Sequence, residues 1–128
     1  MTHLPFFCDL INALAHTRGA GLNPLTETGK TLQENLGDPD LLLFILIDGF
    51  GKTFLERLPR SSFLRDSYKR DLLSVFPSTT ACAMTSLATG LPVSKHGIPG
   101  RYIYLKERNL HADTLAFRER GNKKLLSP

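Results

Sequence analysis

The chain has 128 residues, 41% of them hydrophobic, which suffices for one domain with a real core and argues against disorder. Its 16 lysines and arginines outnumber its 12 aspartates and glutamates, giving a net charge of +4, and the whole excess lies after Gly100. These charges are scattered among leucines and acidic residues, so they do not favour nucleic-acid binding. The two cysteines, Cys8 and Cys82, lack metal or redox spacing and are expected to be reduced and packed.

The chain carries no visible signal for export or membrane insertion. Its N-terminus has no basic region, and Asp9 interrupts the apolar stretch that a signal peptide would need. The longest apolar run, residues 41–47, is too short to cross a bilayer. We therefore expect a cytoplasmic protein of bacterial type.

Helical periodicity and end signals mark several segments. The first has Pro5 at its start, an apolar stripe at helical spacing, and Gly19 shortly after its end. Gly37 would end the second. The segments predicted to be helical are residues 5–16, 28–35, 52–58, 61–68 and 81–89.

Residues 41–47 read LLLFILI and predict a strand that is buried on both faces, as in a parallel sheet. Asp48 follows at the carboxyl end of this strand, where open α/β sheets place their ligands. Gly49 and Gly51 would allow a close approach of backbone or ligand. From the residues alone, Asp48 is equally well explained as a turn former or a helix cap.

Two short stretches imitate the end of a phosphate-binding P-loop: residues 29–31 and 51–53, each reading GKT. A P-loop needs a further glycine five residues before its GK[ST] glycine. Those positions hold Pro24 and Leu46, so both stretches fail the pattern.

Residues 71–97 are the most informative stretch. A second apolar run at 72–76 predicts a buried strand, and Pro77 stops it. Ser78, Thr79 and Thr80 then supply hydroxyls at the start of the 81–89 helix, which Gly90 closes. Free N–H groups and the positive end of the helix dipole gather at that start and suit a phosphate. The simpler alternative is that the hydroxyls only cap the helix.

The remainder of the chain predicts loops and short strands. Residues 91–95 are expected to form a loop and 96–100 a turn-rich segment. Residues 102–105 alternate as a strand does, and 115–117 is a second strand candidate.

The stretch FPSTTACAMTSLATGLPVSKHG closely resembles the nucleophile segment of the type I phosphodiesterase/nucleotide pyrophosphatase family, within the alkaline phosphatase superfamily. In that family a threonine begins a helix that ends Thr-Gly, with a His-Gly pair soon after. Counting back from Thr89 and Gly90 places the nucleophile on Thr80 rather than Thr79. The similarity is specific over residues 41–100.

This resemblance implies an α/β fold of the alkaline phosphatase type, with three α/β/α layers around a largely parallel sheet, incomplete in this chain. Residues 41–47 and 72–76 would be neighbouring parallel strands. Residues 1–128 would form the N-terminal portion of a single catalytic domain.

The resemblance also assigns roles to individual residues. Thr80 would be the nucleophile and a metal ligand, and Asp48 would hold one of two divalent metal ions, most often zinc. The backbone at Ala81 would help to bind the phosphoryl group. Arg101 stands where an asparagine contacts that group in related enzymes, and is otherwise simply a strand residue. His96 matches a residue whose role is usually structural.

One aspartate and one threonine cannot hold two zinc ions, because each ion needs about four ligands. His111 and Asp113 are the only later candidates, and they do not match the ligand motifs of the family. The remaining ligands are therefore expected to lie outside this chain.

The sequence thus predicts a metal-dependent enzyme that hydrolyses phosphodiester or pyrophosphate bonds through a phosphothreonine-type intermediate, with half a catalytic site in this chain. Its partner would be a small-molecule phosphodiester or nucleotide, with neither a membrane nor a nucleic acid involved. The alternative is a non-catalytic truncated domain that binds a phosphate group or a protein partner. We expect the 128 residues alone to be inactive.

Overall fold

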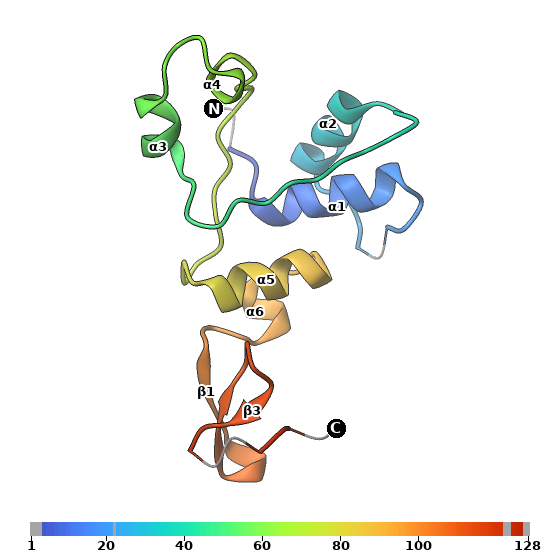
Figure 1. Cartoon of the computed structure of the whole chain (residues 1–128). Coiled ribbons are helices and arrows are strands. Elements are labelled where there is room, and N and C mark those ends of the chain that lie inside the picture. Colours follow the sequence, from blue (N-terminus) through green and yellow to red (C-terminus); the bar gives the residue numbers. More distant parts are fainter. Residues whose placement is uncertain (1–3, 22, 122–123, 127–128) are drawn as a thin grey trace.

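The computed structural model describes residues 4–21, 23–121 and 124–126. In this part of the chain, six helices precede a small antiparallel sheet (Figure 1). The helices are α1 (Phe7–Thr17), α2 (Glu27–Leu36), α3 (Lys52–Arg57), α4 (Phe63–Asp66), α5 (Thr80–Thr89) and α6 (Val93–His96). The strands are β1 (Tyr102–Leu105), β2 (Leu110–Asp113) and β3 (Arg118–Glu119), with a 3₁₀ turn at Lys106–Arg108. None of the described helices has the length and apolar character needed to cross a membrane.

The helices begin and end close to the predicted positions, because their end signals are local in the sequence. Thr26 and Ser62 cap α2 and α4 by accepting hydrogen bonds from backbone N–H groups. Gly37 ends α2 and Gly90 ends α5, the latter in the left-handed conformation at φ 66°. Residues 93–96 were expected to belong to a loop and a turn, and form the short helix α6 instead.

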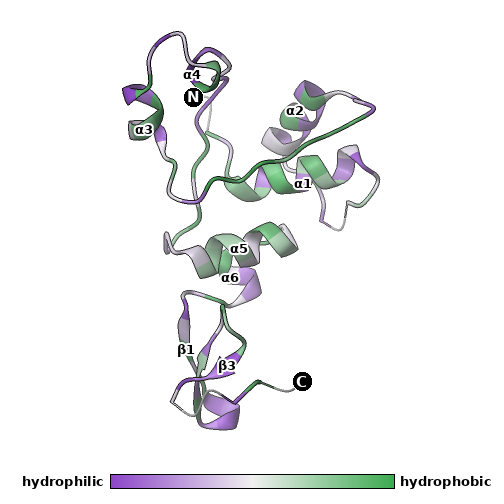
Figure 2. Ribbon diagram, viewed as in Figure 1, coloured by the Kyte–Doolittle hydropathy of each residue, from purple (hydrophilic) through white to green (hydrophobic). Residues whose placement is uncertain are grey.

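Helix α1 packs against both α2 and α5. Ile11 and Ala13 of α1 are buried, as are Leu32 of α2 and Ala81 and Cys82 of α5. Figure 2 shows hydrophobic residues along α1 and α5, the helices that share this small core. Both cysteines are free thiols, as expected.

A buried carboxylate joins α1 to α2. Asp9, only 7% exposed, accepts hydrogen bonds from the hydroxyls of Thr26 (2.6 Å) and Thr28 (3.0 Å). It also accepts the backbone N–H of Phe6, at 2.7 Å, which is an unpaired donor at the start of α1. Asp9 therefore links the first turn of α1 to the start of α2.

The predicted three-layer fold with a largely parallel sheet is wrong for the described residues. Their only multi-stranded sheet is antiparallel, in the order β1-β2-β3, so the architecture is a mixture of helices and a small sheet. Residues 41–47 are extended but belong to no strand, and Leu41, Leu43 and Ile45 are 84%, 76% and 69% exposed. An apolar run alone does not form a buried parallel strand, because such a strand also needs partner strands on its edges and helices on its faces.

Residues 72–76 likewise lack the predicted neighbour. Instead, Leu73 forms an isolated parallel bridge with Phe6, just before α1. The bridge consists of two backbone hydrogen bonds, from Phe7 N to Leu73 O (2.8 Å) and from Leu73 N to Pro5 O (2.9 Å). The N-terminal segment therefore occupies the edge of Leu73 that residues 41–47 were expected to fill.

The C-terminal part is a three-stranded meander beyond α6 (Figure 1). In β1 and β2, Tyr102 pairs with Asp113 and Tyr104 pairs with His111. The 102–105 strand was predicted correctly. The strand expected at 115–117 is wrong, since the chain turns there and strand β3 begins at Arg118.

Candidate active site

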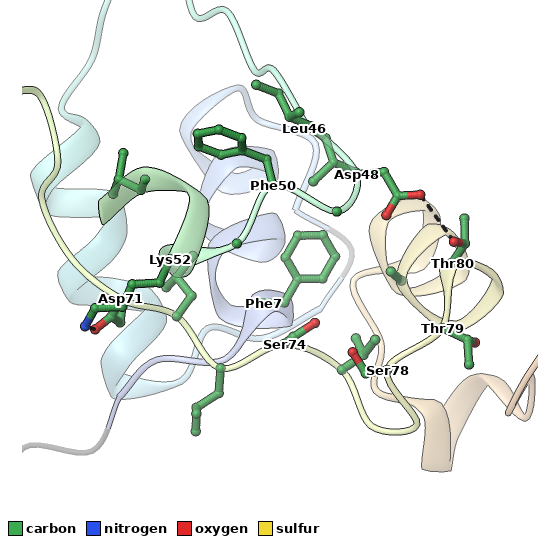
Figure 3. Close-up of a pocket in the computed structure, with 18 of the residues that line it drawn as sticks. Phe7, Leu46, Asp48, Phe50, Lys52, Asp71, Ser74, Ser78, Thr79 and Thr80 are labelled. Atoms are coloured by element: carbon green, nitrogen blue, oxygen red, sulfur yellow. Dashed lines mark hydrogen bonds and ion pairs between the residues drawn. The ribbon is translucent and has the colours of Figure 1, made fainter. Parts of the chain in front are cut away.

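A cavity of about 650 Å³ lies between the turn at residues 46–52, the extended segment 70–75 and the start of α5. Asp48 and Thr80 stand on one side of it, and Lys52 and Asp71 on another (Figure 3). Phe7, Leu72 and Met84 are among the apolar residues that line the cavity. The cavity therefore joins the two segments that the sequence singled out as carrying site residues.

Asp48 and Thr80 are in contact. The Thr80 hydroxyl donates a hydrogen bond of 3.2 Å to the Asp48 carboxylate, across 32 positions of sequence (Figure 3). Thr80 is the first residue of α5, and Asp48 lies in the turn before α3, where Gly49 adopts a positive φ of 76°. Both side chains are exposed, so a ligand can reach the two oxygens.

The neighbouring hydroxyl of Thr79 has a different role. It caps α5 by accepting a hydrogen bond from the Cys82 N–H, at 3.4 Å. The same hydroxyl donates a hydrogen bond to the Cys82 sulfur, at 3.1 Å. The Ala83 N–H bonds to the Thr79 carbonyl. Among the described residues, the N–H groups of Thr80 and Ala81 have no acceptor, as is usual at a helix start. They are donors for an anion at this position.

The other end of α5 is fixed to α1. Asn12 on α1 donates to the Gly90 carbonyl at 2.8 Å, and Asn23 donates to the Thr89 carbonyl at 2.8 Å. Asn23 also donates to the Asn12 side-chain oxygen, at 3.1 Å. These bonds satisfy carbonyls at the helix end that have no partner within the helix.

The middle of α5 is joined to α6. His96 accepts the Ile98 N–H on Nδ1, at 3.1 Å, so its proton lies on Nε2 and is donated to the Ser86 hydroxyl, also at 3.1 Å. Ser86 is fully buried and also hydrogen-bonds to the thiol of Cys8, whose pKa is raised by burial. Burial lowers the pKa of His96, because the charged imidazolium loses hydration. His96 thus has a structural contact on the helix that carries Thr80.

A second polar group lies elsewhere in the cavity. Lys52 donates a hydrogen bond of 2.6 Å to Asp71, and Tyr68 hydrogen-bonds to the same carboxylate. Asp71 raises the pKa of Lys52, and the hydrogen bond from Lys52 lowers the pKa of Asp71. Sequence reasoning missed this group, since no local pattern connects residues 19 positions apart. In the sequence, Lys52 belongs to a GKT stretch that fails the P-loop pattern and to the start of a predicted helix, and neither feature indicates a partner at Asp71.

The side chains of the other predicted site residues take no part in the Asp48–Thr80 contact. Ala81 is 2% exposed, so that only its backbone can meet a ligand. Arg101 forms a bidentate ion pair with Asp113 at 2.9 and 3.1 Å, and lowers the pKa of that carboxyl. The His111 ring lies against Tyr104, with ring centroids 5.1 Å apart. Arg101 and Asp113 are thus paired with each other, and His111 contacts Tyr104, all within the C-terminal part of the chain.

The described residues fit a metal ion only in part. Asp48 and Thr80 offer oxygen donors that suit a divalent cation. No group of three or more His, Cys, Asp or Glu side chains that could hold a metal ion occurs in the described part of the chain. Since a closed zinc site needs about four ligands, the two oxygens of this contact are too few to hold a zinc ion by themselves.

Comparison with known proteins gives a family match over the segment that contains the candidate site. The family model for type I phosphodiesterase / nucleotide pyrophosphatase matches residues 42–123, a range that includes Asp48 and Thr80. No curated protein and no solved structure matches the chain. Because the family model covers more than half of the sequence, the chain belongs to the type I phosphodiesterase/nucleotide pyrophosphatase family of the alkaline phosphatase superfamily.

Proposed function

We propose that this chain supplies the nucleophile and one metal ligand of an enzyme that hydrolyses phosphodiester or pyrophosphate bonds. The observation that carries the proposal is the hydrogen bond between Thr80 and Asp48, at 3.2 Å. These residues are distant in sequence, they are exposed beside a cavity, and the family pattern gives them the roles of nucleophile and ligand. The capping role of Thr79 supports Thr80 as the nucleophile, because Thr79 is already engaged with Cys82.

In the proposed reaction the Thr80 oxygen attacks phosphorus while the bond to the leaving group breaks. The hydroxyl loses its proton as the new bond forms, and the leaving group takes up a proton in return. Water then cleaves the resulting phosphothreonine, which releases the second product and restores the hydroxyl. Asp48 orients the hydroxyl for attack. The free N–H groups of Thr80 and Ala81 would donate to phosphoryl oxygens, whose negative charge grows in the transition state.

Two divalent ions, most often zinc in this family, would supply Lewis-acid stabilisation when bound. Asp48 and Thr80 would contribute donors to them, and the remaining ligands would come from outside the described residues. We therefore propose that residues 1–128 are the N-terminal portion of a single catalytic domain. Arg101 would contact the phosphoryl group only after leaving Asp113, so it is the weaker of the substrate-binding assignments.

The test compares this chain with a longer one that includes whatever the adjoining reading frame encodes. Zinc-dependent release of p-nitrophenol from p-nitrophenyl thymidine monophosphate should occur in the longer chain. Thr80→Ala should abolish turnover while leaving much of the zinc affinity, because it removes the nucleophile. Asp48→Ala should lower zinc affinity and turnover together. Unchanged turnover in Thr80→Ala at saturating zinc would eliminate Thr80, and Thr79 would be the next residue to replace.

A specific observation favours the non-catalytic alternative, namely that the described residues contain no group of three or more His, Cys, Asp or Glu side chains that could hold a metal ion. In that case the α5 start would bind a phosphate group without cleaving it. Calorimetry and the turnover assay together separate the two functions. A phosphate-binding domain would bind a phosphate monoester while neither chain hydrolyses the diester, whereas a catalytic domain would hydrolyse the diester in the longer chain.

A further inference from the structure

The cavity holds a second set of charged groups that the proposed reaction does not use. Lys52 and Arg70 both line it, together with Asp71 and Tyr68. Lys52 and Asp71 lie apart from the Asp48–Thr80 contact, and Phe7 stands between the two pairs (Figure 3). A phosphoryl group held at Thr80 would therefore leave this second set free for another part of the same ligand.

The contacts of Lys52 leave it able to bind an anion. Its ammonium group has three N–H donors, and the hydrogen bond to Asp71 uses one of them. The Lys52 side chain is 56% exposed, whereas Asp71 is 35% exposed and also receives the Tyr68 hydroxyl. Asp71 therefore holds Lys52 in place while its own acceptor capacity is partly used.

The local charge also favours an anion. Within the described residues, no ion pair involves Arg70, which lies next to Asp71 in the chain and lines the same cavity. Lys52 and Arg70 carry two positive charges against the single negative charge of Asp71. This part of the cavity therefore carries a net positive charge, which favours an anionic group of a ligand.

We propose that Lys52, assisted by Arg70, binds a second anionic group at the far end of the substrate. This inference rests on the proposed function, because it takes the phosphoryl group to lie at Thr80. The substrate class would then be a phosphoric ester or anhydride whose leaving group has an apolar spacer and a terminal phosphate or carboxylate. The apolar lining at Phe7, Leu72 and Met84 would contact the spacer.

The experiment measures binding, so it does not depend on turnover by this chain. The probes are alkyl monophosphates and alkanediol bisphosphates of matched length, in a series of increasing spacer length, with an ω-carboxyalkyl phosphate as a third arm. ¹⁵N NMR on the full 128-residue chain gives both the affinity and the site. Any of the phosphates should shift the Thr80 and Ala81 amide signals. At the best spacer length, the bisphosphate should also shift Lys52 and bind roughly three- to tenfold tighter than the monophosphate.

Two variants with opposite expected effects keep the test independent of folding. Lys52→Gln should remove the advantage of the bisphosphate, whereas Asp71→Asn should increase it, because the competing anion is gone. If Lys52 and Asp71 form only a structural ion pair, both variants would change affinity in the same direction. Lys69→Gln is the matched control, since it removes a positive charge from a neighbouring residue that does not line the cavity.

The outcomes separate this inference from the proposed function. If the monophosphate shifts Thr80 but no second anion improves binding at any spacer length, only the Lys52 subsite is wrong. If Lys69→Gln removes the tighter binding of the bisphosphate as fully as Lys52→Gln does, the effect is one of general charge, and the Lys52 subsite is again wrong. If none of the probes shifts the Thr80 and Ala81 amides, the phosphoryl site is wrong and the subsite fails with it. The carboxylate arm shows whether the site requires a phosphate.

Discussion

Asn12 of α1 donates a hydrogen bond to the carbonyl oxygen of Gly90, 2.8 Å away and 78 residues later in the chain. Gly90 is the residue that ends α5, the helix on which Thr80 is the first residue. The candidate nucleophile is therefore positioned from the far end of its helix by a side chain of the N-terminal helix. This relationship gives Gly90 two separate constraints, one conformational and one steric.

We predict that Gly90→Ala destabilises the fold more than a conformational penalty alone would. A side chain in the left-handed region costs about 1–2 kcal/mol. A Cβ at Gly90 would also collide with the Asn12 side-chain oxygen, and losing that contact costs about 1 kcal/mol more. The free energy of unfolding in urea measures the sum.

The matched control is Gly97→Ala. Gly97 also ends a helix in the left-handed region, at φ 72°, but a Cβ there would meet nothing within 4 Å. It should show the conformational cost alone. Equal losses in the two variants would mean that the Asn12 contact adds nothing to the stability of α5.

The Asp9 carboxylate gives a second prediction. Asp9→Ala leaves the Thr26 and Thr28 hydroxyls and the Phe6 N–H without their acceptor at a buried site. The expected loss is about 2–4 kcal/mol of unfolding free energy. Asp38→Ala, at an exposed position after α2, should change stability by less than about 0.5 kcal/mol. A small loss in Asp9→Ala would show that water replaces the carboxylate.

How far the sequence predicts this structure depends on how local each signal is. The limits of α2 and α5 follow from Thr26, Gly37, Thr79 and Gly90, which act on backbone groups within one turn. The runs at 41–47 and 72–76 are apolar, but the prediction of two buried parallel strands from them is wrong, because composition does not determine which partner a segment pairs with. Leu73 pairs with Phe6, and this depends on the path of the whole chain.

The candidate site also has features that a sequence pattern predicted and features that depend on the fold. Asp48 and Thr80 were singled out from the family pattern, and their mutual contact needed the fold to be seen. The Lys52–Asp71 pair had no pattern to reveal it, because neither residue lies in a recognised motif. The ion pair of Arg101 with Asp113 follows from the pairing of Tyr102 with Asp113 across β1 and β2, which two isolated strand predictions could not supply.

His96 gives a prediction about pH. Burial lowers its pKa in the folded chain below the ordinary value near 6.5, so the unfolded chain binds the additional proton first. The stabilisation from neutral His96 is thus fully present above about pH 6.5 and is lost as the pH falls toward the lowered pKa. Protonation of Nδ1 would also remove the acceptor of the Ile98 N–H.

Urea unfolding between pH 5 and 8 measures this effect. The wild type should lose stability as the pH falls below about 6.5, and His96→Gln should lose less over the same interval. The difference between the two proteins is the relevant quantity, because His16 and His111 are common to both. Parallel stability curves would show that the His96 contact with Ser86 does not depend on its protonation.

The exposed run at residues 41–47 gives the last prediction, which concerns the solution behaviour of these 128 residues. Leu41, Leu43 and Ile45 are more than two-thirds exposed, and among the described residues no strand pairs with the run. Such a segment favours pairing between chains. We expect the isolated chain to be marginally stable and to form oligomers whose average size in light scattering grows with protein concentration.

Replacing Leu43 and Ile45 together by lysine should suppress this association, because two charges oppose pairing along the same extended run. Phe117→Lys is the control. Phe117 is also 69% exposed, but it is a single residue in the turn before β3, so its replacement should leave the association nearly unchanged. If the unmodified chain stays a monomer at all concentrations, or if Phe117→Lys is as effective as the double variant, the 41–47 run is not the cause of self-association. A monomer that also binds two zinc ions and turns over substrate would further show that His111, Asp113 or other groups complete the site within this chain.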